Sequence, residues 1–135
     1  MKHAELRVIF LDIDGVLAPI LDPERYGDLD PACMQVLNEI VARSGAEVVV
    51  SSSLRYGKTV AELQRMLDEV GFCGRVLDST PTDLRGCDRG EEIAAWLYDH
   101  PIAGCVILDD HRDMSPLLSR LVQTNAAHGL EHVKK

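Results

Sequence analysis

The segment from Leu6 to Leu11 limits the folds that this chain can adopt, because it is apolar at nearly every position. Such a run is typical of a strand buried on both faces of a sheet. Asp12 and Asp14 follow it, and Gly15 comes directly after them. Carboxylates at the end of a buried strand need a neutralising partner, and Mg²⁺ is a candidate because hard divalent cations take oxygen ligands and pair with phosphate. The alternative is an ordinary Asp-Gly turn after the strand.

Several later segments have the periodicity of amphipathic helices. Residues 31–43 carry apolar side chains at intervals of three and four. Asp30 supplies an N-cap before the proline that begins this segment, and Gly45 can end it. The same periodicity predicts further helices over residues 58–70 and 90–99.

Short apolar runs alternate with these helices and are typical of strands. This alternation predicts a doubly wound, Rossmann-like α/β domain, in which right-handed crossovers place helices on both faces of a parallel sheet of about five strands. In such sheets, ligands bind beyond the carboxyl ends of the strands, where the strand order reverses. The predicted strands cover residues 6–11, 46–50, 75–77, 105–108 and 121–124.

The length and the charge of the chain limit its organisation and its partners. Its 135 residues, 46% of them hydrophobic and 27% charged, suit a single globular domain over residues 1–135. Lys and Arg number 14 against 22 Asp and Glu, which gives a net charge of −8. This charge disfavours a broad basic surface for nucleic acid, although it is compatible with a local basic groove.

The cysteines and the first residues bear on the location of the protein. The first residues fit neither a signal peptide nor a membrane span, because their apolar run is short and is broken by an acid. The cysteines have neither the CxxC nor the Cys/His spacing of zinc sites. We therefore expect reduced thiols in a cytoplasmic protein. The four cysteines are Cys33, Cys73, Cys87 and Cys105.

Polar residues follow several of the predicted strands. Because the carboxyl ends of parallel strands share one edge of a sheet, we expect these residues to form one site. They are Asp12 and Asp14 after the first strand, Ser51, Ser52 and Ser53 with Arg55 after the second, Arg89 at the start of the third helix, and Asp109 with Asp110 after the fourth strand.

In this order, these motifs resemble those of the haloacid dehalogenase (HAD) superfamily of phosphatases and phosphotransferases. In detail, the chain looks like the small HAD domains associated with Swiss-Army-knife RNA repair proteins. HAD enzymes commonly insert a cap domain between these motifs, but the intervals here are short, so we expect a capless domain with residues 18–30 as a flap. The segments that carry the finer likeness are VVVSSSLR, RGEEIAAWL, VILDD and QTNAAHGL.

The resemblance implies a role for each acid. The carboxylate of Asp12 would attack phosphorus to give an aspartyl-phosphate, which divides hydrolysis into two displacements. Asp14 would be the general acid and base, and its backbone carbonyl would bind the metal. Asp109 would be a direct Mg²⁺ ligand, with Asp110 helping through water or hydrogen bonds and Asp113 as a possible substitute. Magnesium would bridge the acids and the phosphate.

Donors and cations around a phosphoryl group stabilise its charge. Ser51 is the expected hydroxyl donor because it directly follows the strand. Ser52 and Ser53 are alternatives for this donor, and all three serines can instead cap the following helix. The resemblance assigns to Arg89 the role of the lysine or arginine that holds the nucleophile and the phosphate together by charge, with Arg85 as the alternative residue. Ser52 and Arg55 are candidates for substrate contact, although Arg55 can equally pair with a surface acid.

These features predict a Mg²⁺-dependent phosphomonoester phosphatase whose substrate is unassigned. An open site suits a phosphorylated macromolecule as well as a small molecule, or an oligomer whose neighbour completes the pocket. The resemblance suggests a nucleic-acid terminal phosphate, while the net charge argues against tight unaided binding. The alternatives are a non-catalytic phosphate-binding or interaction domain and a phosphotransferase that passes the phosphoryl group to an alcohol.

Overall fold

The computed structural model describes residues 6–13, 16–17, 30–51, 57–80, 89–100, 102, 104–109, 114, 117 and 120–124. Within this part of the chain, strands and helices alternate as far as the fourth strand. In chain order the elements are β1 (Arg7–Leu11), α1 (Pro31–Ser44), β2 (Glu47–Val50), α2 (Val60–Asp68), β3 (Val76–Ser79), α3 (Arg89–Asp99), β4 (Gly104–Asp109) and β5 (Leu121–Gln123).

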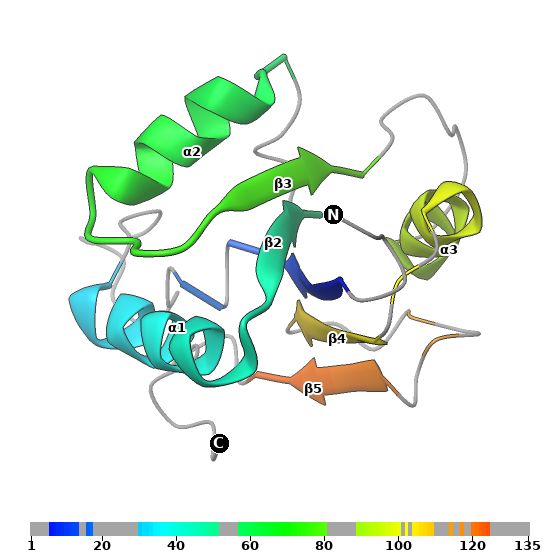
Figure 1. The fold of residues 1–135 in the computed structure, drawn as a ribbon, viewed down its shortest axis with the longest axis horizontal. Coiled ribbons are helices and arrows are strands. Elements are labelled where there is room, and N and C mark those ends of the chain that lie inside the picture. Colours follow the sequence, from blue (N-terminus) through cyan, green and yellow to red (C-terminus); the bar gives the residue numbers. More distant parts are fainter. Residues whose placement is uncertain are drawn as a thin grey trace.

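The strands form one parallel sheet with β1 at its centre (Figure 1). Their order is β3-β2-β1-β4-β5. In the middle of the sheet, Phe10 lies opposite Val49 of β2 on one side and Ile107 of β4 on the other. The chain passes from β1 to β2 and β3 in one direction, and then continues with β4 and β5 on the other side of β1. The strand order therefore reverses between β1 and β4.

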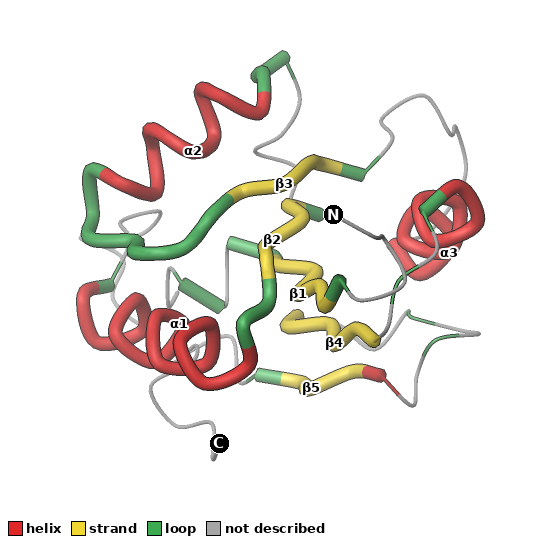
Figure 2. The backbone as a smooth tube through the Cα atoms, in the orientation of Figure 1, coloured by secondary structure: helices red, strands yellow, loops and turns green. Residues whose placement is uncertain are grey.

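Helices cover both faces of the sheet, as Figures 1 and 2 show. The helices α1 and α2 pack on one face, where Ile9 and Leu11 of β1 point toward the cluster that these helices share. The helix α3 packs on the other face, against Val8 and Phe10. These four side chains of β1 are at most 1% exposed, because alternate residues of a strand point to opposite faces and both faces are covered. The predicted doubly wound α/β fold is confirmed.

The predicted elements are all present, with ends that differ by one or two residues. At α1, Asp30 is the predicted N-cap, and its Oδ1 accepts a hydrogen bond from the Ala32 N–H at 2.9 Å. The helix ends at Gly45, whose φ of 70° lies in the left-handed region that favours glycine. Its N–H donates to the carbonyl of Val41 at 2.9 Å.

The Asp30 cap supports a stability prediction. Changing Asp30 to alanine removes the side-chain acceptor, so the free energy of unfolding should fall by about 1 kcal/mol. Asp30→Asn is the control and should be near neutral, because asparagine is an equally good N-cap. Chemical denaturation of the two variants measures this difference, and equal stability would contradict the assigned role of the cap.

The segments between the elements are too short for a large cap domain. Residues 18–29 are all that separates the described residues after β1 from the N-cap of α1, and residues 81–88 separate β3 from α3.

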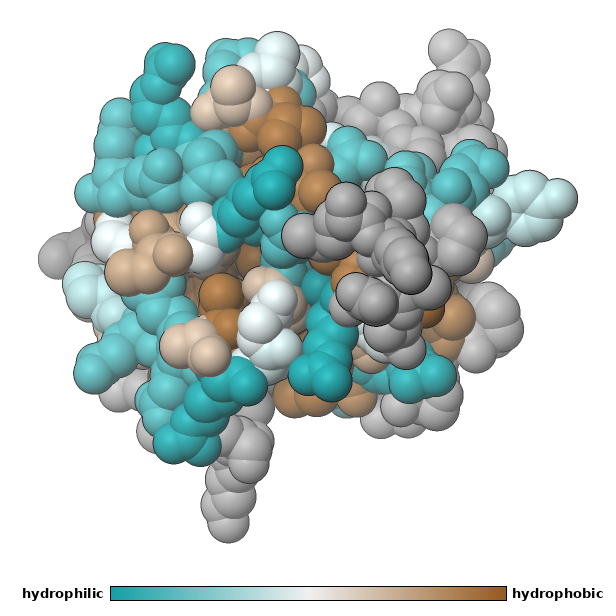
Figure 3. Space-filling view, viewed as in Figure 1, coloured by the Kyte–Doolittle hydropathy of each residue, from teal (hydrophilic) through white to brown (hydrophobic). Residues whose placement is uncertain are grey.

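The surface of the described part of the chain is mixed in polarity. In Figure 3, hydrophilic side chains lie over α1 and α2, and apolar residues show between the elements. No helix in the described part of the chain is long and apolar enough to cross a membrane.

Candidate functional site

Buried polar side chains gather at the carboxyl edge of the sheet. Each strand has one at its last residue or directly after it, and each of these residues is at most 4% exposed. Polar groups withdrawn from water in this way are costly unless they have partners or a function. In the spatial order of the strands they are Thr80, Ser51, Asp12, Asp109 and Thr124.

Backbone hydrogen bonds fix this row by extending the sheet one residue beyond the strands. The Asp12 N–H donates to the Leu108 carbonyl of β4 at 3.0 Å, and the Ser51 N–H donates to the Leu11 carbonyl of β1 at 2.9 Å. The Thr124 N–H donates to the carbonyl of Asp109 at 2.9 Å. Because neighbouring strands lie about 4.8 Å apart, the side chains at this edge start close together on a rigid base.

The two acids of this row lie on adjacent strands at the reversal of the strand order. Asp12 follows β1, and Asp109 is the last residue of β4, which pairs with β1 in parallel. In open α/β sheets, this reversal creates a crevice above the carboxyl ends of the strands where ligands bind. Asp12 and Asp109 therefore lie at the position where the topology predicts a ligand site.

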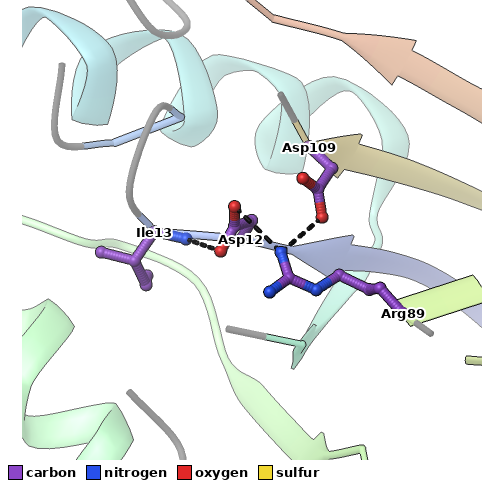
Figure 4. Close-up of polar contacts among 4 residues, drawn as sticks. All are labelled: Asp12, Ile13, Arg89 and Asp109. Atoms are coloured by element: carbon purple, nitrogen blue, oxygen red, sulfur yellow. Dashed lines mark hydrogen bonds and ion pairs between the residues drawn. The ribbon is translucent and has the colours of Figure 1, made fainter. Parts of the chain in front are cut away.

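Arg89 links the two acids (Figure 4). Its Nη1 atom lies 2.8 Å from Oδ2 of Asp109 and 3.1 Å from Oδ2 of Asp12. The side chain of Arg89 is 20% exposed, that of Asp12 5%, and that of Asp109 is fully buried. One guanidinium nitrogen thus bridges two carboxylates that water scarcely reaches.

The surroundings of Arg89 favour its charged form. Burial alone would lower the pKa of the Arg89 guanidinium, but the charges of Asp12 and Asp109 and the hydrogen bonds to them outweigh this effect and raise the pKa above its ordinary value. The second oxygen of Asp12, Oδ1, accepts a hydrogen bond from the Ile13 N–H at 2.8 Å. Both oxygens of Asp12 thus have a fixed partner, which sets the orientation of the carboxylate.

Gly90 determines how closely the start of α3 approaches the residues that follow β4. A Cβ atom at Gly90 would lie 2.6 to 2.9 Å from three backbone atoms of Met114, closer than real Cβ contacts allow. Since the neighbouring residue Arg89 must reach Asp109, this close approach contributes to the geometry of the site. Sequence reasoning did not assign a role to Gly90, although a glycine in the first turn of a helix is a signal for a packing constraint.

The predicted site residues divide into two groups. The structure brings Asp12, Arg89 and Asp109 into contact and places Ser51 on the strand end beside Asp12. Thr80 and Thr124 belong to the same row but were not among the predicted residues. The available signal was the position of Thr80 shortly after the third predicted strand and of Thr124 at the end of the fifth. Outside the described residues lie Asp14, Ser52, Arg55 and Asp110, together with the alternatives Ser53, Arg85 and Asp113.

The donor set is suited to a hard divalent cation. Asp12 and Asp109 offer carboxylate oxygens at adjacent strand ends, and Mg²⁺ is often bound by one or two carboxylates together with waters and substrate phosphate. Within the described ranges, no group of three or more His, Cys, Asp or Glu residues could hold a metal ion. The described residues would thus supply two carboxylate ligands to such an ion.

The fold and the site together define a doubly wound α/β domain with two buried acids, bridged by an arginine, at the reversal of its strand order. Residues 8–134 match the family described as the HAD domain in Swiss Army Knife RNA repair proteins. The match spans nearly the whole chain, and the protein belongs to this family. Searches of curated proteins and of solved structures found no match.

Proposed function

We propose that this protein is a Mg²⁺-dependent phosphomonoester phosphatase that acts through an aspartyl-phosphate on Asp12. The observation that carries this proposal is the bridge from Arg89 to Asp12 and Asp109 at the strand-order reversal of a HAD domain. The guanidinium of Arg89 and the Ile13 N–H fix the orientation of the Asp12 carboxylate, as a nucleophile requires. The same guanidinium can balance charge on a phosphoryl group.

In the first displacement, an oxygen of Asp12 forms a bond to phosphorus while the bond from phosphorus to the ester oxygen breaks. Asp14, two residues along the chain, is the proposed acid that protonates the departing oxygen. In the second displacement, water attacks phosphorus, and Asp14 takes the proton of that water. The bond to Asp12 breaks, and inorganic phosphate leaves with the carboxylate restored.

The neighbouring strand ends supply stabilisation of the phosphoryl charge. Arg89 approaches Asp12 from the start of α3 and can contact a phosphoryl oxygen through a second nitrogen of its planar guanidinium. Ser51 belongs to the strand end directly beside Asp12, where its hydroxyl is the proposed donor. Fixed donors of this kind are effective because they need no rearrangement as charge develops.

Asp12 and Asp109 would hold Mg²⁺, with Asp14 and Asp110 as the proposed further ligands. The bound ion would supply a positive charge that polarises the phosphoryl oxygens and offsets their repulsion with the acids. Ser52 and Arg55, which follow the same strand end as Ser51, are the proposed contacts to the rest of the substrate.

Hydrolysis of p-nitrophenyl phosphate by the purified protein tests the proposal. We expect turnover with millimolar Mg²⁺, its loss on addition of excess EDTA, and its recovery when Mg²⁺ is restored. Turnover that persists in EDTA would contradict the metal requirement. If no phosphomonoester is hydrolysed although Mg²⁺ and phosphate each raise the melting temperature, the protein would be a non-catalytic phosphate-binding domain.

For the substrate class, we propose a terminal phosphate of an oligonucleotide as the first to screen. The matched family is described as the HAD domain in Swiss Army Knife RNA repair proteins. A domain without a large cap also leaves its site open to a macromolecule. The net charge of −8 opposes tight binding of a polyanion, so any such activity should depend on local contacts to the terminal phosphate.

A further inference from the structure

The bridge made by Arg89 has a consequence for metal binding. We propose that the Arg89 guanidinium is a built-in counter-cation that competes with Mg²⁺ for Asp12 and Asp109, so that it weakens the affinity of the site for the ion. The proposal rests on the proposed function in one respect, since it takes these two acids as the metal ligands.

The burial of the two acids shows why a counter-cation is needed. Asp109 is fully buried and Asp12 nearly so, and two ionised carboxylates in such a place repel each other and lose hydration. Arg89 contacts an oxygen of each. Two other ion pairs, Arg43 with Glu39 and Arg75 with Glu47, involve arginines that are 71% and 69% exposed. The buried bridge thus differs in kind from a surface ion pair.

The geometry places the guanidinium and a metal ion in conflict. Arg89 binds both acids through the single atom Nη1, at 2.8 and 3.1 Å, and this atom lies between the two carboxylates. An ion held by both acids would be a second positive charge beside the guanidinium, and the two cations would repel each other. We therefore expect Mg²⁺ binding to break at least one of the contacts that Arg89 makes through Nη1. The released guanidinium would then be available to a phosphoryl oxygen.

Replacement of Arg89 by glutamine tests this competition. Titration calorimetry with MgCl₂ should show binding about tenfold tighter in R89Q than in the wild type, the factor expected when one charge-assisted hydrogen bond no longer has to be broken. Without Mg²⁺, R89Q should melt at a lower temperature than the wild type, because two buried acids lose their counter-charge. Its melting temperature should then rise more with added Mg²⁺. The fluorescence of Trp96, the single tryptophan, reports unfolding in every variant.

R75Q is the matched control. It removes the same charge and breaks an ion pair of similar length, 3.2 Å from Arg75 Nη1 to Glu47 Oε1, on an exposed side chain. Its affinity for Mg²⁺ should equal that of the wild type. Asp109→Asn should weaken Mg²⁺ binding in either background, which locates the ion. R89K keeps the charge but lacks the planar guanidinium, so its affinity for Mg²⁺ should lie between those of R89Q and the wild type. It serves as the measured variant if R89Q does not fold without Mg²⁺.

The outcomes separate this inference from the proposed function. Equal or weaker Mg²⁺ binding in R89Q, or an equal gain in R75Q, would overturn the competition even if the wild type hydrolyses phosphate esters. Tighter binding in R89Q alone would support it even if no turnover is found, in which case the proposed function would be the part that fails.

Discussion

Asp12→Asn should reduce hydrolysis of p-nitrophenyl phosphate to the background rate, a fall in kcat of at least about 10³-fold, as expected when a catalytic nucleophile is removed. The amide has almost the same shape as the carboxylate but cannot form the acyl-phosphate. Its single oxygen also cannot serve both the Ile13 N–H and Arg89, which Asp12 contacts through separate oxygens. The measurement is kcat at saturating Mg²⁺.

Asp30→Asn controls for the change of an acid to an amide. Asp30 caps α1, and asparagine can replace it there, so this variant should keep wild-type kcat. Acid-quenched wild-type protein incubated with ³²P-labelled substrate should carry base-labile label, and the Asp12→Asn protein should carry none. Retention of more than a tenth of the wild-type kcat by Asp12→Asn would show that another group is the nucleophile.

Gly90→Ala should disturb both stability and catalysis, although it adds one methyl group. The new Cβ would overlap the backbone of Met114, so the start of α3 has to move outward. Overpacking of this kind costs about 1–3 kcal/mol in the free energy of unfolding. Arg89 would move with the helix, and a displacement of about 1 Å can reduce kcat about 10²-fold.

Gly104→Ala is the matched control for Gly90→Ala. Gly104 begins β4 at the opposite edge of the sheet, and a Cβ there meets no atom within 4 Å. We expect wild-type kcat and near-wild-type stability for this variant, by thermal unfolding and by the same hydrolysis assay. If Gly90→Ala behaves like Gly104→Ala, the close approach of α3 to Met114 does not position Arg89.

The sequence was sufficient to predict the fold because its strongest signals are local. Strands buried on both faces are continuous apolar runs, and the helices repeat apolar residues at helical spacing. Among the strands, the prediction was least accurate at β3, which continues to Ser79 instead of ending at residue 77. Asp78 is a poor strand former by composition. Its Oδ2 accepts a hydrogen bond from the Trp96 indole N–H at 2.8 Å, and this partner in α3 cannot be recognised from neighbouring residues.

The site was predictable in its residue types but not in its contacts. Position after a predicted strand was enough to select Asp12, Ser51 and Asp109. The bridge through one nitrogen of Arg89 joins three elements that are distant in the chain, so no local pattern encodes it. The role of Gly90 likewise depends on the backbone of Met114, which the fold brings against α3.

The outer position of β3 has a consequence for how this sheet meets other chains. An edge strand exposes unpaired backbone groups that can recruit a strand from another molecule. Here Gln64 of α2 takes up part of this edge: its Oε1 accepts the Val76 N–H at 2.6 Å, and its Nε2 donates to the carbonyl of Gly74 at 3.2 Å. A side-chain amide thus occupies the first pairing positions of the edge, which leaves fewer backbone groups of β3 for pairing with a strand of another chain.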